Sequence, residues 1–170
     1  MLIVVSVLAM LAGAYRWVDA NLPPQYVRAR ICFFVFRTEI ERLESQFEGD
    51  GTFLSVRLSP TSKITIVGEG EVPIETIPED VLGQYAELMQ SARVDWIFRS
   101  DIGTIFSVGS LVRREKEFRA GLLRVAPGMP MPSKCSKALW LTDFGECTVE
   151  LDNEWRLIYN WNPGAEYQSE

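Results

Sequence analysis

The chain has 170 residues and a formal net charge of −6, enough length for one domain of ordinary size with its own hydrophobic core. Its acidic balance argues against nucleic-acid binding, which requires clustered Lys and Arg against the phosphates. It contains no histidine, which excludes Ser-His-Asp and Cys-His catalysis and most catalytic zinc sites, and we expect neither a cofactor nor a metal centre.

Residues 1–18 form the first expected element, an apolar run with a single arginine and no acidic residue. A helix of this length spans about 27 Å, near the thickness of a bilayer's hydrocarbon core. We predict a single-pass membrane anchor over residues 1–20, with Tyr15, Arg16 and Trp17 at the membrane interface. A cleaved signal peptide and a buried element of the fold are the two alternatives.

The charge is uneven along the chain. The first 37 residues carry +3, from four arginines and one aspartate, so the remaining residues carry −9. Behind an anchor, this arginine bias predicts a cytoplasmic position for the rest of the chain, whereas a cleaved signal predicts export. Arg28 and Arg30 are assigned to the membrane interface, with a solvated helix face as the equally weighted alternative.

A long amphipathic helix is expected within residues 21–48. After Pro23 and Pro24, apolar residues recur at alternating spacings of three and four, which places them on one helix face. That face consists of Tyr26, Ala29, Phe33, Phe36, Ile40, Leu43 and Phe47. Residues 31–36 are apolar on all sides, which fits either a helix at a bilayer surface or one buried on two sides.

From Gly51 the chain is expected to form mainly strands. Alternating apolar and polar residues predict strands at 54–59 and 63–66, followed by a helix whose start is marked by a capping box of Thr76 and Glu79. Two further strands follow this helix. The charged run at 113–119 is then expected to precede another strand.

The C-terminal hairpin has the clearest pattern. Inward-facing residues alternate along both strands, with Asp152 and Asn153 at the turn. The inward set is Cys147, Val149, Leu151, Trp155, Leu157, Tyr159 and Trp161. The fold class is therefore α+β: an N-terminal apolar helix, a long amphipathic helix, and a globular domain over 49–170. We expect that domain to hold a mostly antiparallel sheet of about six or seven strands with one further helix packed on it.

The chain has three cysteines and no C-x-x-C pair, so neither a zinc knuckle nor a thioredoxin-type redox site is supported. Cys135 and Cys147 are near enough in sequence to form a disulfide in an exported domain. We favour the alternative that these two and Cys32 are small buried hydrophobic residues.

No motif fixes a reaction. Gly68-Glu69-Gly70 lacks both the third glycine and the following helix of a phosphate-binding turn, and Asp101 is interpreted as a hairpin-turn residue. Asp143 and Glu146, on either side of Gly145, are a candidate carboxylate pair. They can act as acid and base only if their surroundings separate their pKa values.

We therefore expect a membrane-anchored, non-enzymatic protein-binding module of accessory or inhibitor type. Its binding surface is assigned to the outer residues of the C-terminal hairpin, Glu150, Asp152, Glu154 and Arg156, as an acidic patch for a basic protein partner. Membrane contact is assigned to residues 1–18. The alternatives are a carboxylate-dependent hydrolase and a structural subunit of a membrane assembly.

Overall fold

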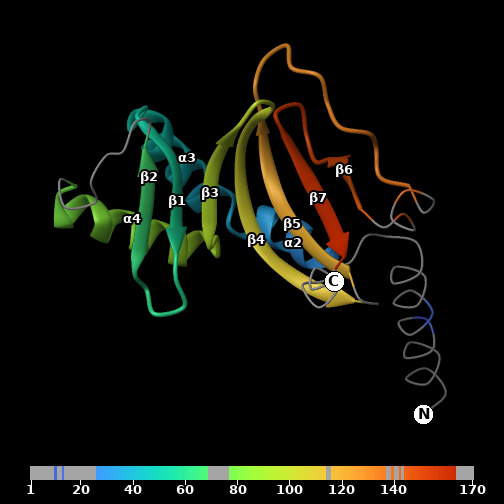
Figure 1. The fold of residues 1–170 in the computed structure, drawn as a ribbon, viewed down its shortest axis with the longest axis horizontal. Helices are drawn as coiled ribbons and strands as arrows, with labels where there is room; N and C mark the ends of the chain where they lie inside the picture. The colour runs from blue at the N-terminus through green and yellow to red at the C-terminus, as the bar shows by residue number, and fades with distance from the viewer. Residues whose placement is uncertain are drawn as a thin grey trace.

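A computed structural model describes residues 10, 13, 26–68, 77–113, 116–136, 139, 142 and 144–163. Its helices and strands follow one another along the chain as Figure 1 shows. The helices are α2 (Tyr26–Val35), α3 (Arg37–Gly49) and α4 (Glu79–Ala92). The strands are β1 (Phe53–Leu58), β2 (Ile64–Gly68), β3 (Trp96–Ser100), β4 (Gly103–Arg113), β5 (Lys116–Val125), β6 (Gly145–Glu150) and β7 (Trp155–Pro163).

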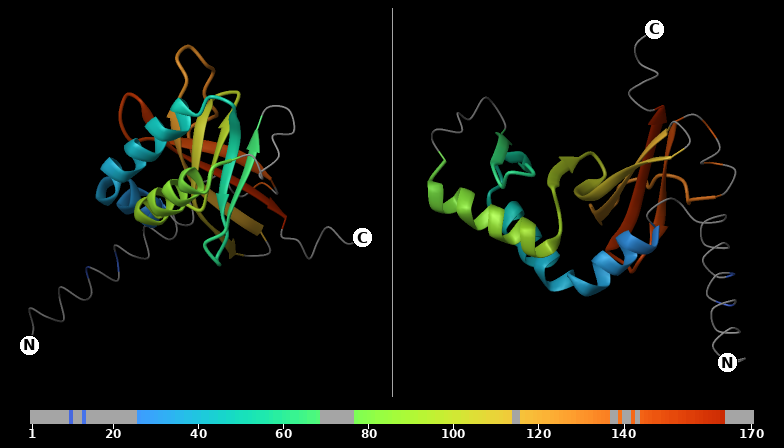
Figure 2. Two further views of the ribbon diagram at one scale, coloured as in Figure 1. Left: turned by 90° about the vertical axis from the view of Figure 1, so that its left-hand side faces the viewer. Right: turned by 90° about the horizontal axis from the view of Figure 1, so that it is seen from below.

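The seven strands form one antiparallel sheet in the order β2-β1-β3-β4-β5-β7-β6. The three helices pack on one of its faces, with α2 against β5 and α3 against α4 (Figure 2). We call the face that these helices leave uncovered the open face. The predicted α+β class, with a mostly antiparallel sheet of about six or seven strands, is confirmed.

The core lies between the helices and the sheet, as the two hydrophobic periodicities predict. Five of the seven apolar residues at spacings of three and four on α2 and α3 are fully buried, and the two others, Tyr26 and Phe36, pack against the core. From the C-terminal hairpin, Trp155 and Leu157 are fully buried and Tyr159 and Trp161 are 1% exposed. The interpretation of that aromatic face as core is therefore confirmed.

The long helix bends at Phe36, where φ is −110° and ψ is 21°. The Phe36 N–H still donates to the Cys32 carbonyl at 2.9 Å, and the Ile40 N–H to the Phe36 carbonyl at 2.9 Å. The chain therefore changes direction without losing its helical hydrogen bonds. On the outer side of α2, Phe34 and Val35 are 58% and 62% exposed, so the apolar run buries only one side among the described residues.

The predicted single-pass membrane protein is wrong. None of the helices in the described ranges is long and apolar enough to cross a membrane. The predicted anchor over residues 1–20, with Tyr15, Arg16 and Trp17, lies outside the described residues apart from Met10 and Gly13. Arg28 and Arg30, also assigned to a membrane interface, occupy exposed positions on α2.

The alternation expected from Leu54 is displaced by one residue at the start of β1. A β-bulge between Phe53 and Ser55 interrupts the pairing with β2. Phe53 is consequently 8% exposed and lies in the core, whereas Leu54 is 37% exposed. Beyond the bulge, Val56 is fully buried and the predicted pattern resumes.

Two element boundaries also differ from expectation. The charged run at 113–119 belongs largely to the β4–β5 hairpin, because β5 begins at Lys116 rather than near Gly121. The N-cap of α4 is Pro78, whose carbonyl accepts the Val81 N–H at 3.1 Å; the proposed capping residue Thr76 lies outside the described residues.

The cysteines correct a further expectation. Cys135 and Cys147 form a disulfide, and only Cys32 is a free, buried thiol. The segment before Cys135 pairs with the outer edge of β6: the Cys135 N–H donates to the Thr148 carbonyl at 3.0 Å, and the Thr148 N–H donates to the Ser133 carbonyl at 2.9 Å. This pairing brings the two cysteines together, which their spacing in the sequence does not reveal.

Candidate functional site

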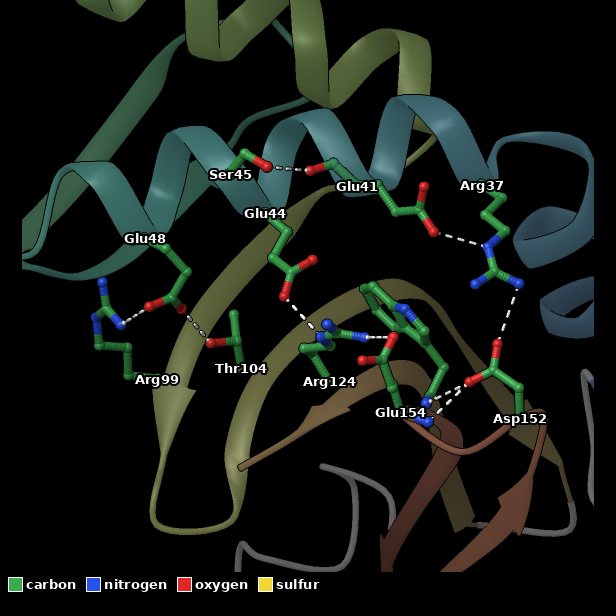
Figure 3. Close-up of polar contacts among 11 residues, drawn as sticks. Arg37, Glu41, Glu44, Ser45, Glu48, Arg99, Thr104, Arg124, Asp152 and Glu154 are labelled. Atoms are coloured by element: carbon green, nitrogen blue, oxygen red, sulfur yellow. Dashed lines mark hydrogen bonds and ion pairs between the residues drawn. The ribbon is translucent and has the colours of Figure 1, made fainter. Parts of the chain in front are cut away.

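A ladder of ion pairs joins α3 to the sheet (Figure 3). Arg37, Glu44 and Glu48 lie on one face of α3 because they are seven and four residues apart. Arg37 Nη1 lies 3.0 Å from Asp152 Oδ2 at the β6–β7 turn. Glu44 Oε1 lies 2.9 Å from Arg124 Nε of β5, and Glu48 Oε2 lies 2.9 Å from Arg99 Nη1 of β3.

Two of these arginines are shared between carboxylates. Arg37 Nε also lies 2.7 Å from Glu41 Oε1, and Arg124 Nη1 lies 2.6 Å from Glu154 Oε2. Hydrogen bonding to Glu154 is the main cause of the raised pKa of the Arg124 guanidinium. Each ladder guanidinium is therefore engaged by a carboxylate.

The surroundings favour the ionised form of two ladder carboxylates, Glu48 and Asp152, whereas burial raises the pKa of the Glu44 carboxyl although Arg124 partly offsets it. Burial opposes ionisation of Glu48, but hydrogen bonds from Arg99 and Thr104 outweigh it and lower the pKa of its carboxyl. Burial likewise opposes ionisation of Asp152, whose pKa is lowered by the backbone N–H groups of Glu154 and Trp155 and by Arg37.

The ladder is best understood as a structural brace. A cavity of about 730 Å³ adjoins it between α3 and the loop that follows β5, but the charged groups that line it are already paired with one another. Solvent-accessible ion pairs of this kind are each worth about 0–1 kcal/mol. The ladder therefore orients α3 on the sheet and leaves little unpaired charge for a ligand.

The four hairpin residues assigned to a protein partner divide between two places. Asp152 and Glu154 belong to the ladder. Glu150 and Arg156 lie directly opposite one another on β6 and β7, with Arg156 Nη1 3.5 Å from Glu150 Oε2, and alternation along the strands puts both on the open face. The structure does not gather the four into one site, and their role in binding stays a prediction.

The open face carries a second cavity, of about 450 Å³, which we call the open-face groove. Its apolar lining includes Trp96, Phe98, Ile105, Gly121 and Ile158. Four lining residues stand side by side across the sheet, because Trp96 pairs with Ser107, Ser107 with Gly121, and Gly121 with Ile158. The groove thus crosses β3, β4, β5 and β7.

An aromatic pair lies at the β3 end of the groove. The rings of Trp96 and Phe98 are stacked with centroids 4.3 Å apart, and both residues are half-buried. Ile97 between them is fully buried in the core on the other face. Gly121 forms part of the floor of the groove, where a side chain would not fit. A Cβ there would lie 3.1 Å from the Ile105 side chain and 3.2 Å from the Phe106 carbonyl oxygen.

A polar row borders the apolar lining at the β6 end. Arg119, Asn160 and Glu146 are register neighbours on β5, β7 and β6. Arg119 donates from Nε and Nη2 to the two carboxylate oxygens of Glu117, at 3.0 and 3.1 Å. Burial raises the pKa of the Glu146 carboxyl, and the hydrogen bond from Asn160 only partly offsets this.

No protein-family model, no characterised protein and no solved structure matches the chain. Function is therefore inferred from the residues of the groove alone. In the sequence, strand alternation shows that Trp96 and Phe98 lie on the opposite face of the sheet from Ile97. It does not show which of the two faces the helices leave uncovered. Glu146 is a candidate from the sequence, whereas its proposed partner Asp143 lies outside the described residues.

Glu146→Gln is expected to raise the midpoint of thermal unfolding at pH 7 by a small amount. The folded-state pKa of Glu146 lies above its unperturbed value of 4.5, so the folded chain disfavours the ionised carboxyl at every pH above the folded-state pKa. The gain should shrink as the pH falls through that pKa and should vanish only below 4.5, where the carboxyl is protonated in both states. Melting curves across this range measure it.

Asp152→Asn is the control with the opposite sign. The folded-state pKa of Asp152 lies below its unperturbed value of 3.8, so its ionised form stabilises the fold above that pH. This substitution should lower the midpoint at pH 7, and the loss should disappear as the pH falls through the folded-state pKa. Effects of the same sign for both variants would contradict the assignment.

Proposed function

We propose that the protein is a non-enzymatic binding module that holds a segment of a protein partner in the open-face groove. One observation carries this proposal: the stacked, half-buried pair Trp96 and Phe98 faces away from the core into a cavity of about 450 Å³. Binding cavities for small ligands and side chains typically measure about 300–1,000 Å³.

The aromatic pair is a costly feature for a surface without a partner. Full burial of one large apolar side chain is worth about 1.5–3 kcal/mol, and half-buried rings forgo part of it. Contiguous exposed apolar surface marks interaction sites, and tryptophan is enriched among the residues that dominate binding energy. Both considerations favour a partner that completes the burial of Trp96 and Phe98.

The disulfide supports an oxidising setting for this module. Disulfides persist mainly in secreted and periplasmic proteins and are rare in the cytosol. Cys135–Cys147 fastens the segment that covers the outer edge of β6. We accordingly propose that binding takes place in such a compartment.

The hydrolase alternative has one observation in its favour. Glu146 lines a groove, and its pKa is raised by burial, as the acid of a carboxylate pair requires. A hydrolytic activity that Glu146→Gln abolishes, while Glu150→Gln leaves it intact, would establish this alternative in place of the binding module.

The proposed function is tested by photo-crosslinking in the cells that make the protein. In one variant, a photoreactive phenylalanine analogue replaces Phe98. In the control variant, the same analogue replaces Val67, an exposed residue on the open face of β2. Ser55 of β1 lies between the two, paired with Phe98 on one side and Val67 on the other. We expect one discrete protein adduct from position 98 and none from position 67.

When Trp96→Ala is added to the variant that carries the photoreactive residue at position 98, the yield of that adduct should fall strongly. Equal adducts from both positions, or none from position 98, would contradict the proposal.

A further inference from the structure

The groove has a charge that the structure leaves unbalanced. Glu146 has no cationic partner among the described residues, and Asp101 at the β3–β4 turn lines the same groove without one. Arg119, the arginine lining the groove, is held by both oxygens of Glu117. Among the described residues of the groove, the uncompensated charge is therefore negative.

Seven carboxylates elsewhere in the described chain are paired with arginine, whereas others, such as Asp50 and Asp95, are not. The paired carboxylates are Glu41, Glu44, Glu48, Glu117, Glu150, Asp152 and Glu154. Glu146 is not among the paired carboxylates, and its surroundings partly desolvate it. A cation from a partner would supply the missing charge and remove this penalty.

The spacing of the two ends sets the length of the partner segment. Trp96 lies on β3 and Glu146 on β6, four steps apart in the strand order. Each step is about 4.8 Å, which gives about 19 Å along the surface of the sheet. A fully extended peptide advances about 3.4 Å per residue, so at least about six residues are needed to span the groove.

The segment must bind across the strands and not beside them. Main-chain pairing at the β6 edge is already taken by residues 133–135, which donate to and accept from Thr148. The occupant therefore contacts the sheet through its side chains, with an apolar group at one end and a cation at the other. The net charge of −6 attracts such a basic partner over longer distances.

We infer that the open-face groove selects an extended, basic segment of polypeptide, in which an apolar side chain packs on Trp96 and Phe98 and a lysine or arginine pairs with Glu146. This inference rests on the proposed function and assigns the partner's chemistry.

The test uses the full, oxidised chain and three Gly-Ser peptides. The first carries a phenylalanine and an arginine about five positions apart, the distance that spans the groove. The second replaces the arginine with glutamate, and the third replaces the phenylalanine with alanine. Calorimetric titration at low ionic strength should show that the first peptide binds at least about tenfold more tightly than either of the others. The second peptide loses the ion pair with Glu146, and the third loses the apolar contact with Trp96 and Phe98.

Substitutions in the protein then locate the contacts. Glu146→Lys should reverse the preference in favour of the glutamate peptide, and Glu146→Gln, a milder change, should abolish the preference for charge. Trp96→Ala should remove the advantage of phenylalanine over alanine. Glu150→Lys is the matched control, because it makes the same change of charge on the same strand and face, at a residue paired with Arg156. With this variant the first peptide should still bind more tightly than the other two.

Binding that ignores the charge of the peptide, or an equal response to Glu146→Lys and Glu150→Lys, would overturn the inference, as would the absence of binding by every peptide. The proposed function is judged separately. A Phe98 adduct that is formed while the charge preference fails means that the groove binds a partner of different chemistry. Loss of the adduct itself removes the proposed function.

Discussion

Trp155→Ala is expected to lower the free energy of unfolding by about 3–5 kcal/mol, the usual range for removal of a fully buried tryptophan. The side chain is fully buried where α2 meets the sheet, with its ring centroid 5.6 Å from that of Phe33 and 5.4 Å from that of Phe106. The Arg124 guanidinium lies over the ring, 5.5 Å from its centroid. The substitution therefore opens a cavity between the two layers and removes a contact of the ladder.

Trp96→Ala is the matched control, since it deletes the same side chain from the open face. Trp96 is half-buried and outside the core, so we expect a loss of about 1 kcal/mol, roughly half the value of full burial. Urea titrations followed by far-ultraviolet circular dichroism give both values without relying on tryptophan fluorescence. Similar losses for the two variants would mean that Trp96 is part of the packed core and that the groove is not a free surface.

Hydrophobic periodicity was sufficient to predict the layers of this fold. The helix face from Tyr26 to Phe47 and the alternating C-terminal hairpin both lie in the core. Such patterns report which side of an element is buried, because each side chain's direction is fixed by the local backbone. The bulge at Phe53 is the exception, since one extra residue in a strand exchanges the two faces and leaves the composition unchanged.

The candidate site was predicted less well because it depends on contacts between distant parts of the chain. Asp152 and Glu154 read from the sequence as free surface acids, but their arginine partners, Arg37 and Arg124, come from another helix and another strand. The groove combines residues of five strands, and only the order of those strands shows that Trp96 and Glu146 line one cavity. Alternation identifies the outer face but not whether a helix covers it.

Removal of the disulfide by the double substitution Cys135→Ala and Cys147→Ala is expected to lower the free energy of unfolding by about 3 kcal/mol. The two cysteines are 12 residues apart, and a cross-link that closes a loop of this size restricts the unfolded chain by about that amount in the chain-entropy model. The cross-link also fastens residues 133–135 to the edge of β6, which protects that edge from pairing with other chains.

Reduction of the natural chain should reproduce this loss, whereas the same reductant should leave the stability of the double variant unchanged. Burial raises the pKa of the Cys32 thiol, so it should react slowly in the folded protein and remain a free thiol throughout. Thiol titration of the unfolded, unreduced chain should therefore count one thiol, and three after reduction. A count of three before reduction, in protein prepared under oxidising conditions, would show that the β6 edge is held by hydrogen bonds alone and would remove the support for an oxidising compartment.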